Sequence, residues 1–190
     1  MKKIIYVFLI SCFSLTISTC SVNWGSNKDD TTSGLYVSVG NSGTIIISSD
    51  GITWTFSTSG TSSILWEIKY GNSTFVTVGD SGTILTSSDG TSWDNRTSST
   101  KKSLAGLTYG NSTFVTVGGS GTILTSSDGT SWTSRTSGAS DTLWGVIYGK
   151  SAYVVVVGTL GTVLTSSDLT TWTSRTSNTS NNLLEVTYKE

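Results

Sequence analysis

The sequence predicts an all-β protein, a small β-propeller of four four-stranded antiparallel blades whose ring is closed by the C-terminal strand pairing into the first blade. The motif YGNSTFVTVGDSGTILTSSDGTSW at Tyr70–Trp93 returns almost letter for letter at Tyr109–Trp132 and more loosely at Tyr148–Trp172. The tryptophans that end the four copies lie 39, 39 and 40 residues apart: Trp54, Trp93, Trp132 and Trp172. A fixed period near forty in a strand-rich sequence is typical of propeller blades or of a β-solenoid.

Each repeat divides into four short β-rich runs separated by turn residues. In the second repeat the expected strands are Ile64–Tyr70, Thr74–Val78, Thr83–Ser88 and Ser92–Thr97. The dipeptides Gly-Asn and Asp-Gly between them favour tight hairpin turns. No apolar pattern of period 3.6 persists beyond the first twenty residues, so little helix is expected.

Counting these strands predicts how the ring closes. The first repeat begins at Leu35–Val39 and lacks its first strand, whereas Leu183–Tyr188 follows the last repeat as an extra one. Placing the extra strand in the first blade completes four blades and removes two open sheet edges. This tally favours a closed monomer. Two copies paired head to tail in an eight-bladed ring, a piece of a longer propeller and a β-solenoid are the alternatives.

The N-terminal residues have the form of an export signal. Two lysines precede the apolar run Ile4–Ile17, which is too short for a membrane span of about 20 residues. The segment then ends ISTC, which resembles a bacterial lipobox. We therefore expect a lipoprotein-type signal peptide at 1–19, lipid attachment at Cys20, a polar tether to residue 33 and the propeller at 34–190. This predicts export across the inner membrane and anchoring to a bacterial cell membrane or outer membrane; cleavage without lipid and an uncleaved anchor are the alternatives.

Composition excludes several classes of chemistry. The chain has no histidine, so imidazole bases, imidazole metal ligands and histidine-based triads are ruled out. Its two cysteines, Cys12 and Cys20, precede the repeats, which therefore carry no disulfide. The 11 basic and 12 acidic residues form no basic cluster, which gives no reason to expect nucleic acid. No cofactor is expected.

A second motif carries a family resemblance. SSDGITW, SSDGTSW, SSDGTSW and SSDLTTW resemble the Asp-box, or BNR repeat, of sialidase-like propellers, although glycine here follows the aspartate directly. The longer frame is similar to that of photosystem II assembly factors and bacterial secreted propellers. The resemblance implies a structural turn, in which the aspartates accept backbone hydrogen bonds and the tryptophans pack between blades. The residues concerned are Asp50, Trp54, Asp89, Trp93, Asp128, Trp132, Asp168 and Trp172.

The same resemblance includes enzymes, but this sequence lacks what they need. A sialidase grips a carboxylate with clustered arginines, whereas Arg96, Arg135 and Arg175 occupy one position of the outer strand in three separate blades. We therefore expect no catalytic residues and a non-catalytic binding or scaffold module. The alternatives are a glycosidase and a purely structural surface protein.

The positions at which the repeats differ predict where a ligand binds. Trp66 and Trp144 in the first strand, with Asp80 in the next turn, form a possible platform for a protein or carbohydrate ligand. Glu67 and Glu185 would lie on adjacent blades of a closed ring, where they hold a cation or are simply hydrated. We assign no metal site, and the alternative for both tryptophans is packing in the core.

Overall fold

The computed structural model describes residues 34–150 and 154–190. The expected signal peptide, the lipid attachment at Cys20 and the tether lie outside the described residues. Within the described ranges, no helix has the length and apolar character needed to cross a membrane.

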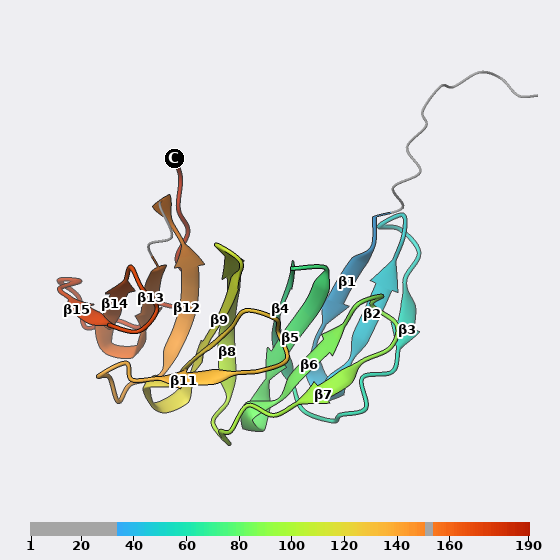
Figure 1. Ribbon diagram of the computed structural model, residues 1–190, viewed down its shortest axis with the longest axis horizontal. Helices are drawn as coiled ribbons and strands as arrows, with labels where there is room; N and C mark the ends of the chain where they lie inside the picture. Colours follow the sequence, from blue (N-terminus) through green and yellow to red (C-terminus); the bar gives the residue numbers. More distant parts are fainter. Residues whose placement is uncertain (1–33, 151–153) are drawn as a thin grey trace, which may run out of the picture. The chain divides into compact units, whose positions relative to one another are not determined.

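The described chain is built of β-strands in four antiparallel sheets, each a simple meander (Figure 1). The first sheet holds β1 (Tyr36–Val39), β2 (Ile45–Ser48) and β3 (Thr55–Ser57). The second holds β4 (Leu65–Gly71), β5 (Thr74–Gly79), β6 (Ile84–Ser87) and β7 (Asp94–Arg96). The third holds β8 (Leu104–Gly110), β9 (Thr113–Gly118), β10 (Ile123–Ser126) and β11 (Thr133–Arg135). The fourth holds β12 (Leu143–Tyr148), β13 (Val154–Gly158), β14 (Val163–Ser166) and β15 (Thr173–Arg175).

Lys150, before β13, has 3-10 geometry, and the other helical residues that the structure describes form single 3-10 turns between the second and third strands of each repeat. They are η1 (Asn41–Gly43), η2 (Asp80–Gly82), η3 (Gly119–Gly121) and η5 (Thr159–Gly161). The all-β prediction is therefore confirmed for the described residues. The outer strands are shorter than expected, since β7 covers Asp94–Arg96 whereas Ser92–Thr97 was predicted. The reason is that the backbone N–H groups of Thr91 and Ser92 bind the Asp89 carboxylate and not a neighbouring strand.

The core lies between consecutive sheets. Strand β4 contacts β1 on one side and β8 on the other, and β8 contacts β12 in turn. Apolar residues from both sheets fill each interface, and the third sheet shows how. Phe114 faces the second sheet and Val115 faces the fourth, and neither side chain is accessible to solvent. Alternation of side chains along each strand thus supplies both faces of every inner sheet.

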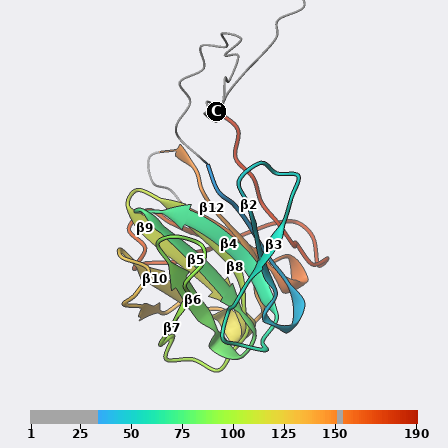
Figure 2. The same cartoon turned by 90° about the vertical axis from the view of Figure 1, so that its right-hand side faces the viewer.

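The predicted closure of the ring is absent from the described part of the chain. The first sheet has three strands, and Leu183–Tyr188 belongs to no strand. This segment lies beside the fourth sheet, where a Cβ added to Gly145 would meet the Glu185 Cα at 2.8 Å. The first and fourth sheets are at opposite ends of the series of sheets (Figures 1 and 2). The tally counted Leu183–Tyr188 as a strand of the first blade, whereas this segment forms no strand and continues the series beyond the fourth sheet without returning to its start.

Candidate functional site

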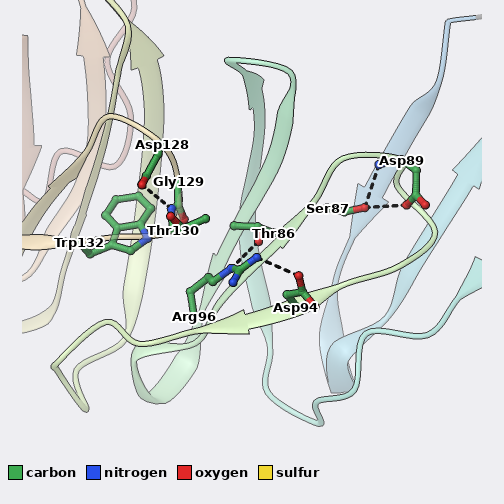
Figure 3. A network of polar contacts seen from close by, with 9 residues as sticks. All are labelled: Thr86, Ser87, Asp89, Asp94, Arg96, Asp128, Gly129, Thr130 and Trp132. Atoms are coloured by element: carbon green, nitrogen blue, oxygen red, sulfur yellow. Dashed lines mark hydrogen bonds and ion pairs between the residues drawn. The ribbon is translucent and has the colours of Figure 1, made fainter.

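The four Asp-containing turns are structural. In each, one carboxylate oxygen accepts hydrogen bonds from the backbone N–H groups two and three residues later and from a serine hydroxyl two residues earlier. Asp89, for example, accepts from Thr91 N and Ser92 N at 2.8 and 2.9 Å. It also accepts from Ser87 Oγ at 3.0 Å (Figure 3). Asp50, Asp128 and Asp168 repeat this set.

These hydrogen bonds favour the charged carboxylate. The backbone N–H groups of Thr53 and Ile52, followed by the Ser48 hydroxyl, lower the pKa of Asp50 from 3.8 to about 2. Bonding from Ser92 lowers the pKa of Asp89 further still. Each carboxylate is therefore occupied by its own turn, and no three acidic or cysteine side chains among the described residues come together as a metal site.

The tryptophans after these turns sit between sheets where a preceding sheet exists. Trp93, Trp132 and Trp172 each pack against the apolar cluster between their own sheet and the one before. Trp132 also donates its indole N–H to Gly129 O at 2.9 Å (Figure 3). Trp54, in the first sheet, has no such neighbour among the described residues and is 40% exposed.

The three arginines brace their own sheets. Arg96 donates from Nε to Thr86 Oγ1 at 2.8 Å and from a terminal nitrogen to Asp94 at 2.9 Å (Figure 3). Arg135 and Arg175 donate from Nε to the equivalent threonines, Thr125 and Thr165. Each arginine thus joins the third and fourth strands of a different sheet, so the three do not converge on one ligand.

A β-bulge positions the two candidate ligand-binding tryptophans. In the second sheet Leu65 pairs with Gly79 and Glu67 with Val78, so Trp66 between them has no partner across the strands. Trp144 occupies the same bulge of the fourth sheet. A bulge re-aims the side chain of its extra residue. Here it directs each indole toward the turn that follows the second strand.

Each indole is fixed by the first residue of that turn. Trp66 donates from Nε1 to Asp80 Oδ1 at 2.7 Å, and Trp144 donates from Nε1 to Thr159 Oγ1 at 3.2 Å. In the third sheet, which lies between them, the corresponding pair is Ala105 and Gly119. Both members of that pair are small, so the place that an indole fills in the neighbouring sheets stays open.

The result is a groove of about 400 Å³ with a tryptophan on either side, which we call the Trp–Ala–Trp groove. Its lining comprises Trp66, Asp80, Lys101, Lys102, Ser103, Ala105, Gly119, Thr142 and Trp144. Trp66 is 51% exposed, and both lysines are exposed. The groove therefore offers two aromatic surfaces, two positive charges and one carboxylate already bound to an indole.

The structure separates the predicted ligand residues into two groups. Trp66, Asp80 and Trp144 line one groove, whereas Glu67 and Glu185 do not. Glu67 pairs with Lys69 Nζ at 2.9 Å. Glu185 lies beyond β12, so two further innermost strands separate the two glutamates. The expectation that they lie on adjacent blades was wrong because it depended on closure of the ring.

Sequence reasoning missed Lys101 and Lys102. The corresponding residues are Ser62 and Ser63 one repeat earlier, and Ser140 and Asp141 one repeat later. The two lysines are therefore a departure from the repeat in the loop before the first strand, and this departure is visible in the sequence.

Comparison with known proteins agrees with the architecture. No family model matches the chain, and no curated protein does. A solved structure described as YCF48 bound to D1 peptide superposes with a TM-score of 0.61 at 20% identity, covering 78% of this chain and 52% of that one. YCF48 from Cyanidioschyzon merolae gives 0.57 at 18%, covering 74% and 52%. The fold is that of a β-propeller.

An ancestral GH74 enzyme is also similar, with a TM-score of 0.54 at 16% identity and coverage of 74% of this chain and 23% of that one. The chain thus spans about half the length of the YCF48 chains and about a quarter of the GH74 enzyme. At these identities the comparisons establish the fold, and the site must be argued from this chain's own residues.

Proposed function

We propose that this protein is an extracytoplasmic, lipid-anchored and non-catalytic binding module that holds an extended acidic peptide in the Trp–Ala–Trp groove. The observation that carries the proposal is the single departure from repeat symmetry that opens the groove. Ala105 and Gly119 stand where the neighbouring sheets have an indole and its hydrogen-bond acceptor. Support also comes from the YCF48 structure, which has a D1 peptide bound.

The chemistry of the lining selects the ligand class. Indole faces bind apolar or aromatic side chains, and a groove of about 400 Å³ lies within the size range of pockets that hold small ligands. Lys101 and Lys102 add positive charge at the rim, where they attract carboxylates. Asp80 already accepts from the Trp66 indole, so its charge is partly satisfied. An acidic peptide with apolar side chains matches this combination.

The lining also supports a non-catalytic role. Glycoside hydrolysis ordinarily needs two carboxyl groups about 5–10 Å apart across the scissile bond. Asp80 is the single acidic residue that lines the groove among the described residues, and it is held by Trp66. A neutral oligosaccharide could stack on the tryptophans but leaves the lysines without a role, so the peptide is preferred.

The decisive experiment refills the groove. Ala105→Trp places an indole at the bulge where both neighbouring sheets already carry one, so the fold should tolerate it. Binding of acidic and neutral peptide libraries and of neutral oligosaccharides is measured by calorimetry. We expect the full-length protein to bind acidic peptides and Ala105→Trp to lose at least tenfold in affinity. The matched control, Leu184→Trp, adds the same side chain at the same repeat position outside the groove.

A second part of the experiment tests the positive charge of the groove. Replacing Lys101 and Lys102 with glutamate should abolish binding of acidic peptides, whereas Lys69→Ala, outside the groove, should leave it unchanged. Retention of full affinity in Ala105→Trp would refute the site. Preference for neutral oligosaccharides, insensitive to the lysines, would replace the peptide with a carbohydrate.

The proposed anchor is tested separately. Metabolic labelling with a fatty acid in a bacterial host should modify the wild-type protein and not Cys20→Ser. Cys12→Ser is the matched control and should be labelled as the wild type is. Labelling that survives Cys20→Ser would contradict the proposed attachment site.

A further inference from the structure

The two ends of the series of sheets are complementary, and this complementarity is independent of the groove. The first sheet lacks the innermost strand that β4, β8 and β12 provide in the other sheets. The innermost edge of β1 therefore has no strand partner among the described residues. An open strand edge is a template for pairing with another chain.

The segment Leu183–Tyr188 has the position of the missing type of strand. Leu183 N donates to Gly158 O at 3.0 Å, as Leu65 N, at the start of β4, donates to Gly40 O at 3.0 Å. Its sequence LLEVTY also matches LWEIKY in β4. The segment thus lies against the fourth sheet in the position that the innermost strand of a fifth sheet would take, with no strand beside it among the described residues.

The outer face of the first sheet is half of an interface between sheets. Tyr36 is 57% exposed, although Phe114 at the same repeat position is fully buried. Phe56, also on this face, is 83% exposed, and the Tyr36 and Trp54 ring centroids are 6.4 Å apart. Contiguous exposed aromatic groups of this kind mark interaction surfaces.

The other half lies on the fourth sheet. Val155 and Val163 are only half-buried, whereas their repeat equivalents, Val115 and Ile123, are fully buried against the next sheet. A cavity of about 620 Å³ adjoins Val155 and is bounded by Val186 and Tyr188 of the C-terminal segment. This end therefore presents the apolar surface that inner sheets pack against their successors.

We infer that two copies of this chain associate head to tail, the segment Leu183–Tyr188 of each pairing with β1 of the other. A second copy is the occupant that fits, because the interface is already present between consecutive sheets within the chain. The register of β4 on β5 transfers directly and places Val186 of one copy opposite Ser38 of the other. Each first sheet then gains its fourth strand.

Two copies bring eight complete sheets together, which lies within the four to eight blades of typical propellers. A head-to-tail contact forms a ring when its rotation closes and a filament when it does not. The ring of two makes both contacts identical and leaves no innermost edge open.

The experiment counts copies of the full-length chain by native mass spectrometry from detergent. The wild type should give twice the mass of one chain. Phe56→Asp blocks the first-sheet face and Thr187→Pro blocks the pairing segment; both residues are exposed, so the single chain should stay folded. Each variant alone should fall to one copy. Thr133→Asp, which adds the same charge on exposed β11, is the control and should remain a dimer.

Mixing the two variants tests the head-to-tail contact by complementation. The intact segment of Phe56→Asp should pair with the intact β1 of Thr187→Pro, restoring a dimer that contains one chain of each. A wild type with the mass of one chain, a dimer that both variants preserve, or a mixture that stays monomeric would each overturn the head-to-tail contact. Open-ended polymers would overturn the ring of two.

Discussion

Gly129 tests how tightly consecutive sheets pack. It has φ of +75°, and an added Cβ would lie 2.9 Å from Val76 Cγ2 and 3.6 Å from Phe114 Cε2. Alanine at positive φ costs about 1 kcal/mol. Forcing a methyl group into a packed interface costs about 1–3 kcal/mol more. Gly129→Ala should therefore lower the free energy of unfolding by about 2–4 kcal/mol.

Gly138 is the matched control for this prediction. Its φ is +73°, but an added Cβ would meet nothing within 4 Å. Gly138→Ala should therefore lose only the backbone contribution, about 1 kcal/mol. Urea unfolding followed by tryptophan fluorescence measures both losses at a common slope. Equal losses in the two variants would show that Gly129 does not contact the second sheet and would refute the packing described between β5 and the turn.

Three further outcomes follow from the same interfaces and turns. Phe114→Ala should lower the free energy of unfolding by about 3–5 kcal/mol, because this side chain is fully buried. Tyr36→Ala, at the same repeat position but exposed, should lower it by less than about 1 kcal/mol in dilute solution, where single chains dominate. Chemical unfolding of the two variants measures both losses. Folding lowers the pKa of Asp50 from 3.8 to about 2, so this carboxylate stabilises the fold above pH 4 and loses that effect as the pH falls toward 2. The melting temperature of Asp50→Asn should therefore depend less on pH between 4 and 2 than that of the wild type. Gly129→Leu should destabilise more than Gly129→Ala, and adding Phe114→Val should recover part of the loss, as denaturant midpoints would show.

Much of the fold could be predicted because every repeat has the same pattern of β-rich runs and turn residues. The alternation in Thr74–Val78 and the Asp-Gly turn at Asp89 fix strands and hairpins locally, and both agree with the structure. Closure could not be predicted in the same way. Leu183–Tyr188 completes a sheet equally well within one chain or between two, since its pairing pattern is the same in both cases. The local sequence therefore predicted a strand at Leu183–Tyr188 but could not predict its partner, and no strand forms there within the single chain.

The candidate site was predicted in part, for a related reason. Trp66 and Trp144 were found because they break the repeat at one strand position. Their contribution to a groove depends on Ala105 between them and on a bulge that the strand pattern does not reveal. Lys101 and Lys102 lie in a connecting loop, where no period draws attention to single residues. Glu67 and Glu185 failed as a pair because their proximity required a long-range contact.

Departures from the repeat fall into two kinds that differ in how volume is balanced. In the fourth repeat Leu169 replaces the glycine of the turn at φ of +61°, while Val154 replaces the phenylalanine that faces Gly129 one repeat earlier. A larger residue thus comes with a smaller neighbour, and the interface stays filled.

At Ala105 and Gly119 both members of a pair become small together, so volume is lost and a hollow opens to solvent. The first kind of change preserves stability, since a filled interface keeps its buried apolar contacts. The second kind of change adds no stability through packing, because an emptied surface position gains no contact. This unbalanced loss of volume between two tryptophans is therefore the feature on which we base the proposed ligand site.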